Sequence, residues 1–400
     1  MSAKTQTVNA LCQLLSRGDE ADRCYVSRTL GVLQDSAALP ALTEYLRDED
    51  PDVCIDAAEA LGRIGDPKAV PALLELLQNH PDGEVRTAAV EALGNISDPR
   101  VTSALITVAA KRPENLAWED EWDDWWDMQL HAVKALGRMR AVAAVPMLQH
   151  ILEDEESQGI ETEILTALAC IGGKGLKVLE QRLICGTDPE RRRAATVLGH
   201  AGNDEAVALL SHALLDKNTD VRCAGIKALG TANATHYLKV VLVSLKDPEP
   251  EIRNAAIETS AQLASGANHA DGIIEQLIPL LDDQNPLVRA TTIKTLTTLA
   301  TERTLAPGVV EQICLRLSDQ DTAVVTAACH FLAQFRTPQA KSDLLQIATS
   351  QQAGIYLRQQ AIHALGTSGD TGEEILNALT NAIGDSEQII RLESLTTLMK

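Results

Sequence analysis

The sequence predicts an all-α protein, a right-handed α-solenoid of about twelve helical hairpins that spans residues 1–400 as a single array. A phrase in which an arginine precedes a glycine by eight positions recurs along the chain, and apolar residues recur around it at helical spacing. Hydrophobic residues make up 45% of the chain and aromatic residues only 2%. A core built from aliphatic side chains favours packed helices over strands.

The recurring phrase is clearest at residues 82–94, where an acidic turn leads into Arg86 and the phrase ends at Gly94. The same distance separates four further pairs: Arg23 and Gly31, Arg191 and Gly199, Arg222 and Gly230, and Arg358 and Gly366. Three more arginines keep the register while another residue takes the glycine place: Arg253 with Ala261, Arg289 with Thr297, and Arg391 with Met399. The twelve units end at positions 31, 62, 94, 137, 172, 199, 230, 261, 297, 333, 366 and 399. Intervals of this size are typical of paired-helix repeats.

Each unit contains two apolar blocks, which we interpret as a first and a second helix. In one unit they are Val70, Leu73, Leu74 and Leu77, followed by Val85, Ala88, Ala89, Ala92 and Leu93. Four Asp-Pro pairs are predicted to cap the next helix: Asp66-Pro67, Asp98-Pro99, Asp188-Pro189 and Asp247-Pro248. We expect the glycine that closes a second helix to adopt the left-handed C-terminal turn.

The phrases DPKAVPALL at residues 66–74 and VRTAAVEALG at residues 85–94 resemble the HEAT-like repeats of the phycobilisome-lyase type, over nearly the whole chain. Such repeats occur in bilin lyase subunits, assembly factors and signalling adaptors, so the resemblance implies the fold and leaves the function open. It also implies a ladder of acids and arginines across neighbouring repeats, for which the candidate pairs are Asp82 with Arg86, Asp220 with Arg222, and Glu251 with Arg253. We expect interruptions where another residue takes the arginine place, at Cys54, Gln129, Ile164 and Val325.

The fourth repeat is longer than the others and contains an insert at about residues 114–127. Residues 118–127, WEDEWDDWWD, consist only of tryptophan and acidic residues and include all four tryptophans of the chain. The tryptophans follow helical spacing, so a helix here would carry them on one face and carboxylates on the other. We interpret residues 114–138 as a second helix lengthened at its N-terminal end; a folded-back loop is the alternative.

The insert supplies the candidate partner-binding residues: Trp118, Trp122, Trp125, Trp126, Asp123, Asp124 and Asp127. Residues 114–163 contain thirteen acids and three bases, a net charge of −10 out of −21 for the whole chain. Four tryptophans bury roughly 600–1,000 Å², more than the roughly 300–600 Å² of the largest apolar patch on an ordinary monomer. They therefore either pack on the neighbouring hairpin or bind a protein client through a basic, partly apolar segment.

Charge and composition exclude several classes of function. A net charge of −21 disfavours nucleic acid and anionic membrane surfaces as partners. No apolar run approaches the ~20 residues of a membrane span, and residues 1–17 read as an amphipathic helix instead of a signal peptide, so we expect a cytoplasmic protein. None of the eight cysteines forms a C-x-x-C pair, so the sequence predicts no metal site and no cofactor.

Three classes of function remain to be compared. A non-catalytic scaffold, adaptor or assembly factor is favoured, because no catalytic residues are recognised. A bilin lyase-like subunit or chromophore chaperone is the alternative, with a tetrapyrrole lying on the tryptophans. Among enzymes, deoxyhypusine hydroxylase resembles this fold but has His-Glu metal ligands, and none of the nine histidines here precedes a glutamate. Helical-repeat DNA glycosylases have a basic groove, which this acidic chain does not predict.

Overall fold

The computed structural model describes residues 3–110, 120–153, 159–264, 270–300, 307–335, 340–367 and 372–399. Within these ranges the chain forms 24 α-helices and short 3₁₀ helices, and no strand. The helices form twelve consecutive pairs, which confirms the predicted all-α solenoid of hairpins. Contacts divide the chain into two compact units, Met1–Ala213 and Leu214–Lys400, which we describe separately.

The helices alternate between first and second members of a hairpin. The first helices are α1 (Ala3–Leu15), α3 (Leu39–Glu44), α5 (Val70–Asn79), α7 (Thr102–Ala110), α9 (Val145–Leu152), α11 (Lys174–Cys185), α13 (Asp204–Leu214), α15 (Leu238–Ser244), α17 (Ala270–Leu277), α19 (Pro307–Leu315), α21 (Lys341–Thr349) and α23 (Glu373–Ile383). The second helices are α2 (Glu20–Leu33), α4 (Pro51–Ile64), α6 (Gly83–Ile96), α8 (Asp120–Arg138), α10 (Glu161–Ile171), α12 (Asp188–Ala201), α14 (Thr219–Thr231), α16 (Pro250–Leu263), α18 (Pro286–Ala300), α20 (Thr322–Phe335), α22 (Ile355–Thr367) and α24 (Gln388–Leu398). The 3₁₀ helices are η1 (Ser36–Ala38), η2 (Tyr45–Arg47), η3 (Pro67–Ala69), η4 (Pro99–Val101), η5 (Val142–Ala144), η7 (Thr235–Tyr237), η8 (Ile278–Asp282) and η9 (Arg316–Ser318).

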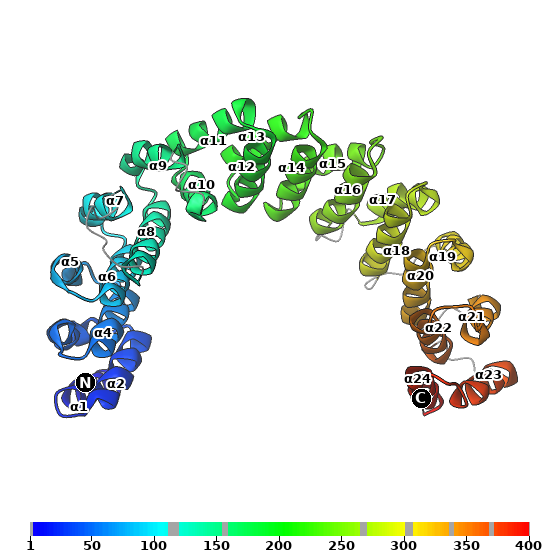
Figure 1. Cartoon of the computed structure of the whole chain (residues 1–400), viewed down its shortest axis with the longest axis horizontal. Coiled ribbons are helices and arrows are strands. Elements are labelled where there is room, and N and C mark those ends of the chain that lie inside the picture. The colour runs from blue at the N-terminus through cyan, green and yellow to red at the C-terminus, as the bar shows by residue number, and fades with distance from the viewer. Residues whose placement is uncertain are drawn as a thin grey trace. The chain divides into compact units, whose positions relative to one another are not determined.

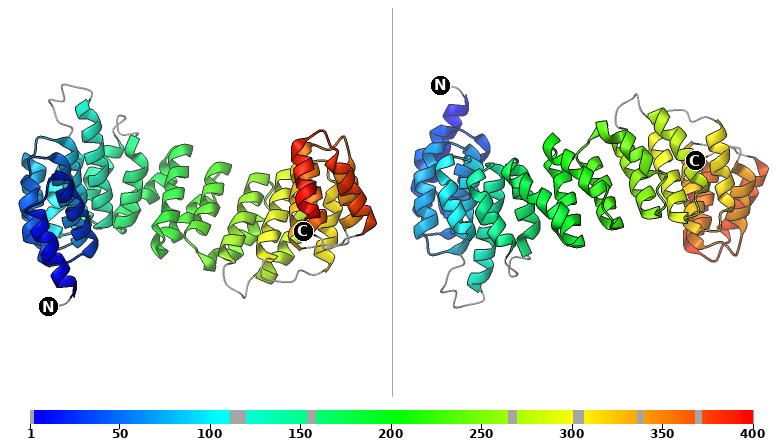
Figure 2. Two further views of the ribbon diagram at one scale, coloured as in Figure 1. Left: turned by 90° about the horizontal axis from the view of Figure 1, so that it is seen from below. Right: turned by 90° about the horizontal axis from the view of Figure 1, so that it is seen from above.

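Each unit consists of two layers of helices. Second helices pack on second helices, for example α2 on α4 and α4 on α6 in the first unit, and α18 on α20 in the second. First helices pack on their own partners, as α5 does on α6 and α21 on α22. Figure 1 shows the two layers within each unit, and the turned views of Figure 2 show neighbouring helices lying side by side.

The core of each unit lies between these layers. The leucine directly before the glycine place is almost fully buried in repeat after repeat: Leu30, Leu61, Leu93, Leu136, Leu198, Leu229, Leu296, Leu332 and Leu365. Because one hairpin covers only one side of such a leucine, burial requires the neighbouring repeat, and stability therefore comes from stacking. Among the described residues, no helix is long and apolar enough to cross a membrane.

The repeat glycines lie inside the second helices, so the predicted left-handed turn at these glycines is wrong. A Cβ on Gly62 would lie 2.8 Å from the Cα of Ala92 in the next second helix. Glycine therefore allows two second helices to approach closely. Gly172, with φ 74°, is the exception that follows its helix. In the first three repeats, a residue with left-handed backbone conformation lies three positions after the glycine place: Gln34, Gly65 and Ser97.

The predicted Asp-Pro caps are correct at two sites and wrong at two. Asp66 and Asp98 accept hydrogen bonds from the backbone N–H two residues ahead and precede η3 and η4. Asp188 lies inside α12, where the cap is Thr187 in a reciprocal capping box with Glu190. Asp247 lies two residues before the cap of α16, so its carboxylate supports the turn instead of the helix end.

Candidate functional site

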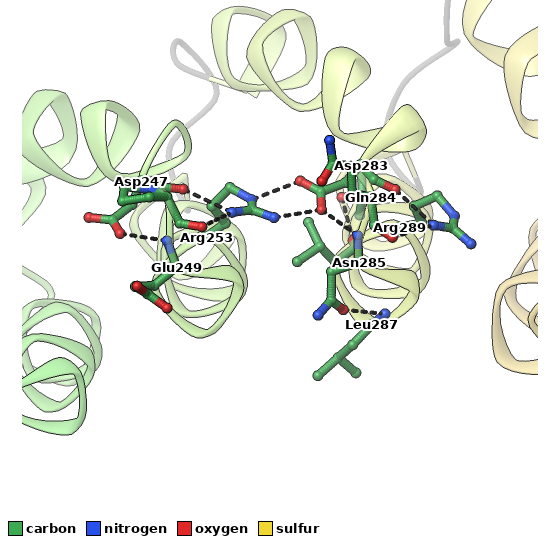
Figure 3. Close-up of polar contacts among 11 residues, drawn as sticks. Asp247, Glu249, Arg253, Asp283, Gln284, Asn285, Leu287 and Arg289 are labelled. Atoms are coloured by element: carbon green, nitrogen blue, oxygen red, sulfur yellow. Dashed lines mark hydrogen bonds and ion pairs between the residues drawn. The ribbon is translucent and has the colours of Figure 1, made fainter.

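Arginine side chains join consecutive repeats on the loops that enter the second helices. Nη1 of Arg253 donates to the carbonyl oxygens of Asp247 and Pro248 in its own turn, at 2.9 Å each. Its Nε and Nη2 form a fork on the carboxylate of Asp283 in the next repeat, at 2.7 Å each (Figure 3). The Arg253 side chain is 14% exposed and that of Asp283 is 7% exposed. One guanidinium therefore fixes its own turn and the following repeat together.

The same ladder recurs in both units, in three further pairs: Arg23 with Asp48, Arg289 with Asp319, and Arg358 with Asp385. Each carboxylate lies six positions before the arginine place of its repeat. The ladder implied by the family resemblance is present, but the predicted acids were wrong. Within the described part of the chain, no ion pair joins the predicted partners, Asp82 with Arg86, Asp220 with Arg222, or Glu251 with Arg253. Asp82 instead caps α6, because its carboxylate reaches the N–H of Val85.

The four repeats without an arginine interrupt the ladder, as expected. Each of them lacks the side chain that would pair with the acid of the following repeat. Cys54, Gln129, Ile164 and Val325 are all buried. The thiol of Cys54 lies 3.4 Å from the carbonyl oxygen of Asp48, and Nε2 of Gln129 donates to Ala109 at 2.8 Å. The acid of such a repeat still accepts the arginine of the repeat before it, as Asp48 does.

Helices α18, α20 and α22 lie in the second-helix layer of unit 2, where they line a cavity of about 730 Å³. A ladder pair, Arg289 with Asp319, joins α18 to the turn before α20, whereas Val325 leaves α20 without such a pair to α22. Lys294 and Thr298 come from α18, His330 and Gln334 from α20, and Tyr356 and Gln360 from α22. Among the described residues that line this groove there is no aspartate or glutamate. We call this surface the second-helix groove.

The second-helix groove was not predicted from the sequence. The position five residues after the arginine place holds glutamate in three repeats: Glu59, Glu91 and Glu258. It holds a basic residue or histidine in four others, Arg28, Lys134, Lys227 and His363, and the buried Ala169 in repeat five. In repeats nine and ten the same position holds Lys294 and His330. A basic residue or histidine at this position therefore does not by itself mark the groove, since Lys227 and His363 hold the same position and do not line it.

The tryptophan-acid segment predicted as a partner site is only partly described. Residues 114–119, including Trp118, lie outside the described residues. Trp122, Asp123 and Asp124 fall within α8, but their side chains also lie outside what the structure describes. Helix α8 has 19 residues against 14 in α6, with the additional length at its N-terminal end.

The described tryptophans of α8 have different surroundings. Trp125 is 9% exposed, and its ring centroid lies 5.7 Å from that of half-buried Trp126. The indole of Trp126 lies against Gly159, where a Cβ would stand 3.2 Å from the ring. Asp127 is exposed. The side chain of Trp125 is therefore packed inside the protein, whereas that of Asp127 is exposed to solvent.

The metal-ligating side chains and two cysteine thiols of the described residues bear on the chemistry open to the chain. They contain no cluster of three or more His, Cys, Asp or Glu side chains that could hold a metal ion. Burial raises the pKa of Cys329, beside His330, to about 12. The pKa of Cys24 is raised to about 11, mainly by burial and to a smaller extent by a hydrogen bond with Asp56. Both thiols are therefore protonated and weakly nucleophilic at neutral pH.

A two-layered stack of helical hairpins defines the class of α-solenoid proteins. The family model of HEAT repeats matches residues 8–94, 57–120, 120–196, 176–261 and 274–356. These matches cover more than half of the chain, which therefore belongs to the HEAT-repeat family.

Several known proteins are similar to this chain. Deoxyhypusine hydroxylase from Bos taurus is 28% identical over 231 residues, 56% of this chain and 70% of the relative, and the Homo sapiens enzyme is 29% identical over 240 residues, with the same coverage. The karyopherin Kap121p, solved bound to the extreme C-terminus of the protein phosphatase Cdc14p, is 13% identical with a TM-score of 0.51, covering 98% of this chain and 49% of that one. The CpcE–CpcF complex of phycocyanin lyase from Nostoc is 23% identical with a TM-score of 0.36, covering 64% and 94%.

Proposed function

We propose that this chain is a non-catalytic protein-binding scaffold, an adaptor or assembly factor that holds a segment of a protein client on its second helices. The observation that carries the proposal is the second-helix groove, which combines apolar surface with lysine, histidine and glutamine side chains and in which a ladder pair joins α18 to the turn before α20. Kap121p provides a precedent for an α-solenoid that binds the end of another protein chain. A rigid repeat surface suits this task, because little conformational entropy is lost when the client binds.

We propose a second contact at the tryptophan-acid helix. Its members are the predicted residues Trp118, Trp122, Trp125, Trp126, Asp123, Asp124 and Asp127. Half-buried Trp126 and exposed Asp127 support it, because an aromatic ring beside a carboxylate suits a basic, partly apolar segment. Trp125 is buried and would support the ring of Trp126 from behind.

Filling the second-helix groove tests the scaffold function. Thr326 lines the groove, and its hydroxyl donates to the carbonyl four residues earlier. Thr231 makes the same type of bond on α14 and does not line the groove, so Thr231→Trp is a matched control for Thr326→Trp. In affinity purification from the native cell, we expect one set of proteins to be retained by wild type and by Thr231→Trp and lost from Thr326→Trp. Equal retention by all three proteins would contradict the proposal.

The bilin lyase-like alternative gives a different result. Incubation of the full chain with a bilin would change both the pigment absorbance and the tryptophan fluorescence, and Trp126→Ala would abolish that change. Unchanged spectra would leave the scaffold as the proposed function.

A further inference from the structure

The second-helix groove differs in charge from the rest of the chain. The chain contains 56 acidic and 35 basic residues. The described lining of the groove nevertheless contains Lys294 and His330 and no acid. Lys294 therefore offers a negatively charged group a positive partner in a lining without acids.

Three acids on the lining helices or their neighbours lie outside the lining and have hydrogen-bond partners of their own. Asp321, directly before Thr322, accepts the N–H of Ala323 at 2.8 Å at the start of α20. Glu258 occupies the equivalent position on α16, outside the lining, and accepts a hydrogen bond from Asn254 at 3.4 Å. On α24, Glu393 is paired with His363 at 2.9 Å. No carboxylate of the described chain forms an ion pair with Lys294 or His330, so the charge of Lys294 is free for a ligand.

The remaining lining groups suit a polypeptide backbone. The side-chain amides of Gln334 and Gln360 line the groove and have no hydrogen-bond partner among the described residues. An amide offers both a donor and an acceptor, as an extended backbone requires for its own C=O and N–H groups. Tyr356, 61% exposed, provides an apolar ring at the edge of α22. The volume of about 730 Å³ falls within the range of ligand-binding clefts.

From these observations we infer that the second-helix groove binds an extended, acidic segment of the client. An aspartate or glutamate of the segment pairs with Lys294, and the backbone of the segment bonds to Gln334 and Gln360. This inference rests on the proposed scaffold function and names the chemistry of the bound segment. It assigns the groove a preference opposite to that proposed for the tryptophan-acid helix.

Selection from a random peptide library tests the inference. The full chain, Lys294→Glu and Lys227→Glu would each be used to select from phage displaying random twelve-residue peptides. Lys227 occupies the same repeat position on α14 and does not line the groove, so Lys227→Glu controls for the charge change. We expect the wild-type and Lys227→Glu pools to be enriched in aspartate and glutamate, and the Lys294→Glu pool to lose that enrichment. Synthetic copies of selected peptides should bind Lys294→Glu about threefold to tenfold more weakly.

Thr326→Trp separates failure of this inference from failure of the proposed function. Peptides without acidic enrichment whose binding is lost in Thr326→Trp would overturn the acidic preference and leave the scaffold function standing. Peptides that bind Thr326→Trp as well as wild type would overturn the groove as a binding site, and with it the observation behind the proposed function. Circular dichroism of each variant identifies any loss of folding before binding is compared.

Discussion

At the scale of single residues, the ladder requires arginine. Arg253 uses four hydrogen bonds to reach two backbone carbonyls and one carboxylate at once. The planar guanidinium presents its donors in a fixed fork, whereas a lysine ammonium at this position would be a single point of charge. The pair with Asp283 is largely buried, so loss of one partner leaves the other poorly solvated.

The ladder predicts unequal costs for two similar substitutions. Asp283 and Asp247 both accept the backbone N–H two residues ahead, but only Asp283 accepts the fork of an arginine in the described structure. We expect Asp283→Asn to lower the free energy of unfolding by about 1.5–3 kcal/mol, the usual value of hydrogen bonds to a charged group. Asp247→Asn should cost less than about 1 kcal/mol. Urea unfolding followed by far-ultraviolet circular dichroism measures both, and equal losses would contradict the ladder.

Asp319 makes the ladder sensitive to pH. Burial acts to raise the pKa of Asp319. Hydrogen bonds from Arg289 and from the N–H of Asp321 together lower it by more, so the pKa lies below its ordinary value. A carboxyl with a depressed folded-state pKa stabilises the fold above its unfolded pKa of about 3.9 and loses that contribution as pH falls through the folded value. We expect the stability of wild type to fall below about pH 4 more steeply than that of Asp319→Asn. Urea unfolding between pH 3 and pH 6 gives the two slopes, and parallel slopes would sink this explanation.

At the scale of helices, the glycine place controls the approach of neighbouring second helices. Any side chain at Gly62 would meet the backbone of α6 at Ala92. We expect Gly62→Ala to destabilise the first unit by about 1–3 kcal/mol, although alanine is the better helix former. Gly272 in α17 has open space around it, so Gly272→Ala should stabilise by about 0.5–1 kcal/mol. Thermal unfolding of the two variants tests this contrast in sign.

The hairpins were predictable from sequence because helix period and repeat length are local properties. The close contact at Gly62 was not, since it depends on Ala92 thirty residues away and on the helix continuing beyond the glycine. The ladder acids were misassigned for the same reason: Asp283 lies close to its own helix in sequence but pairs with Arg253 of the preceding repeat. The groove escaped prediction because its residues are unremarkable one at a time.

At the scale of the whole molecule, the charge of −21 and the two proposed contacts suggest a client with segments of opposite charge. Attraction of a basic segment to the acidic α8 region should weaken as salt rises, because the Debye length shrinks from about 10 Å at 0.1 M to about 3 Å at 1 M. We expect Trp122→Ala combined with Trp126→Ala to abolish capture through this region without loss of helicity. Pull-down at increasing salt and circular dichroism measure the two effects, and unfolding of the double variant would assign both tryptophans to the core.

Site-specific photo-cross-linking tests the scaffold function most directly. A benzophenone amino acid would be placed at Thr326 in the second-helix groove or at Leu315, 63% exposed at the end of a first helix of the same unit. In extract of the native cell, we predict a protein client cross-linked through an acidic segment at position 326, not at position 315, and lost when Lys294→Glu is added. Equal cross-linking at both positions, or none at position 326, would contradict the account.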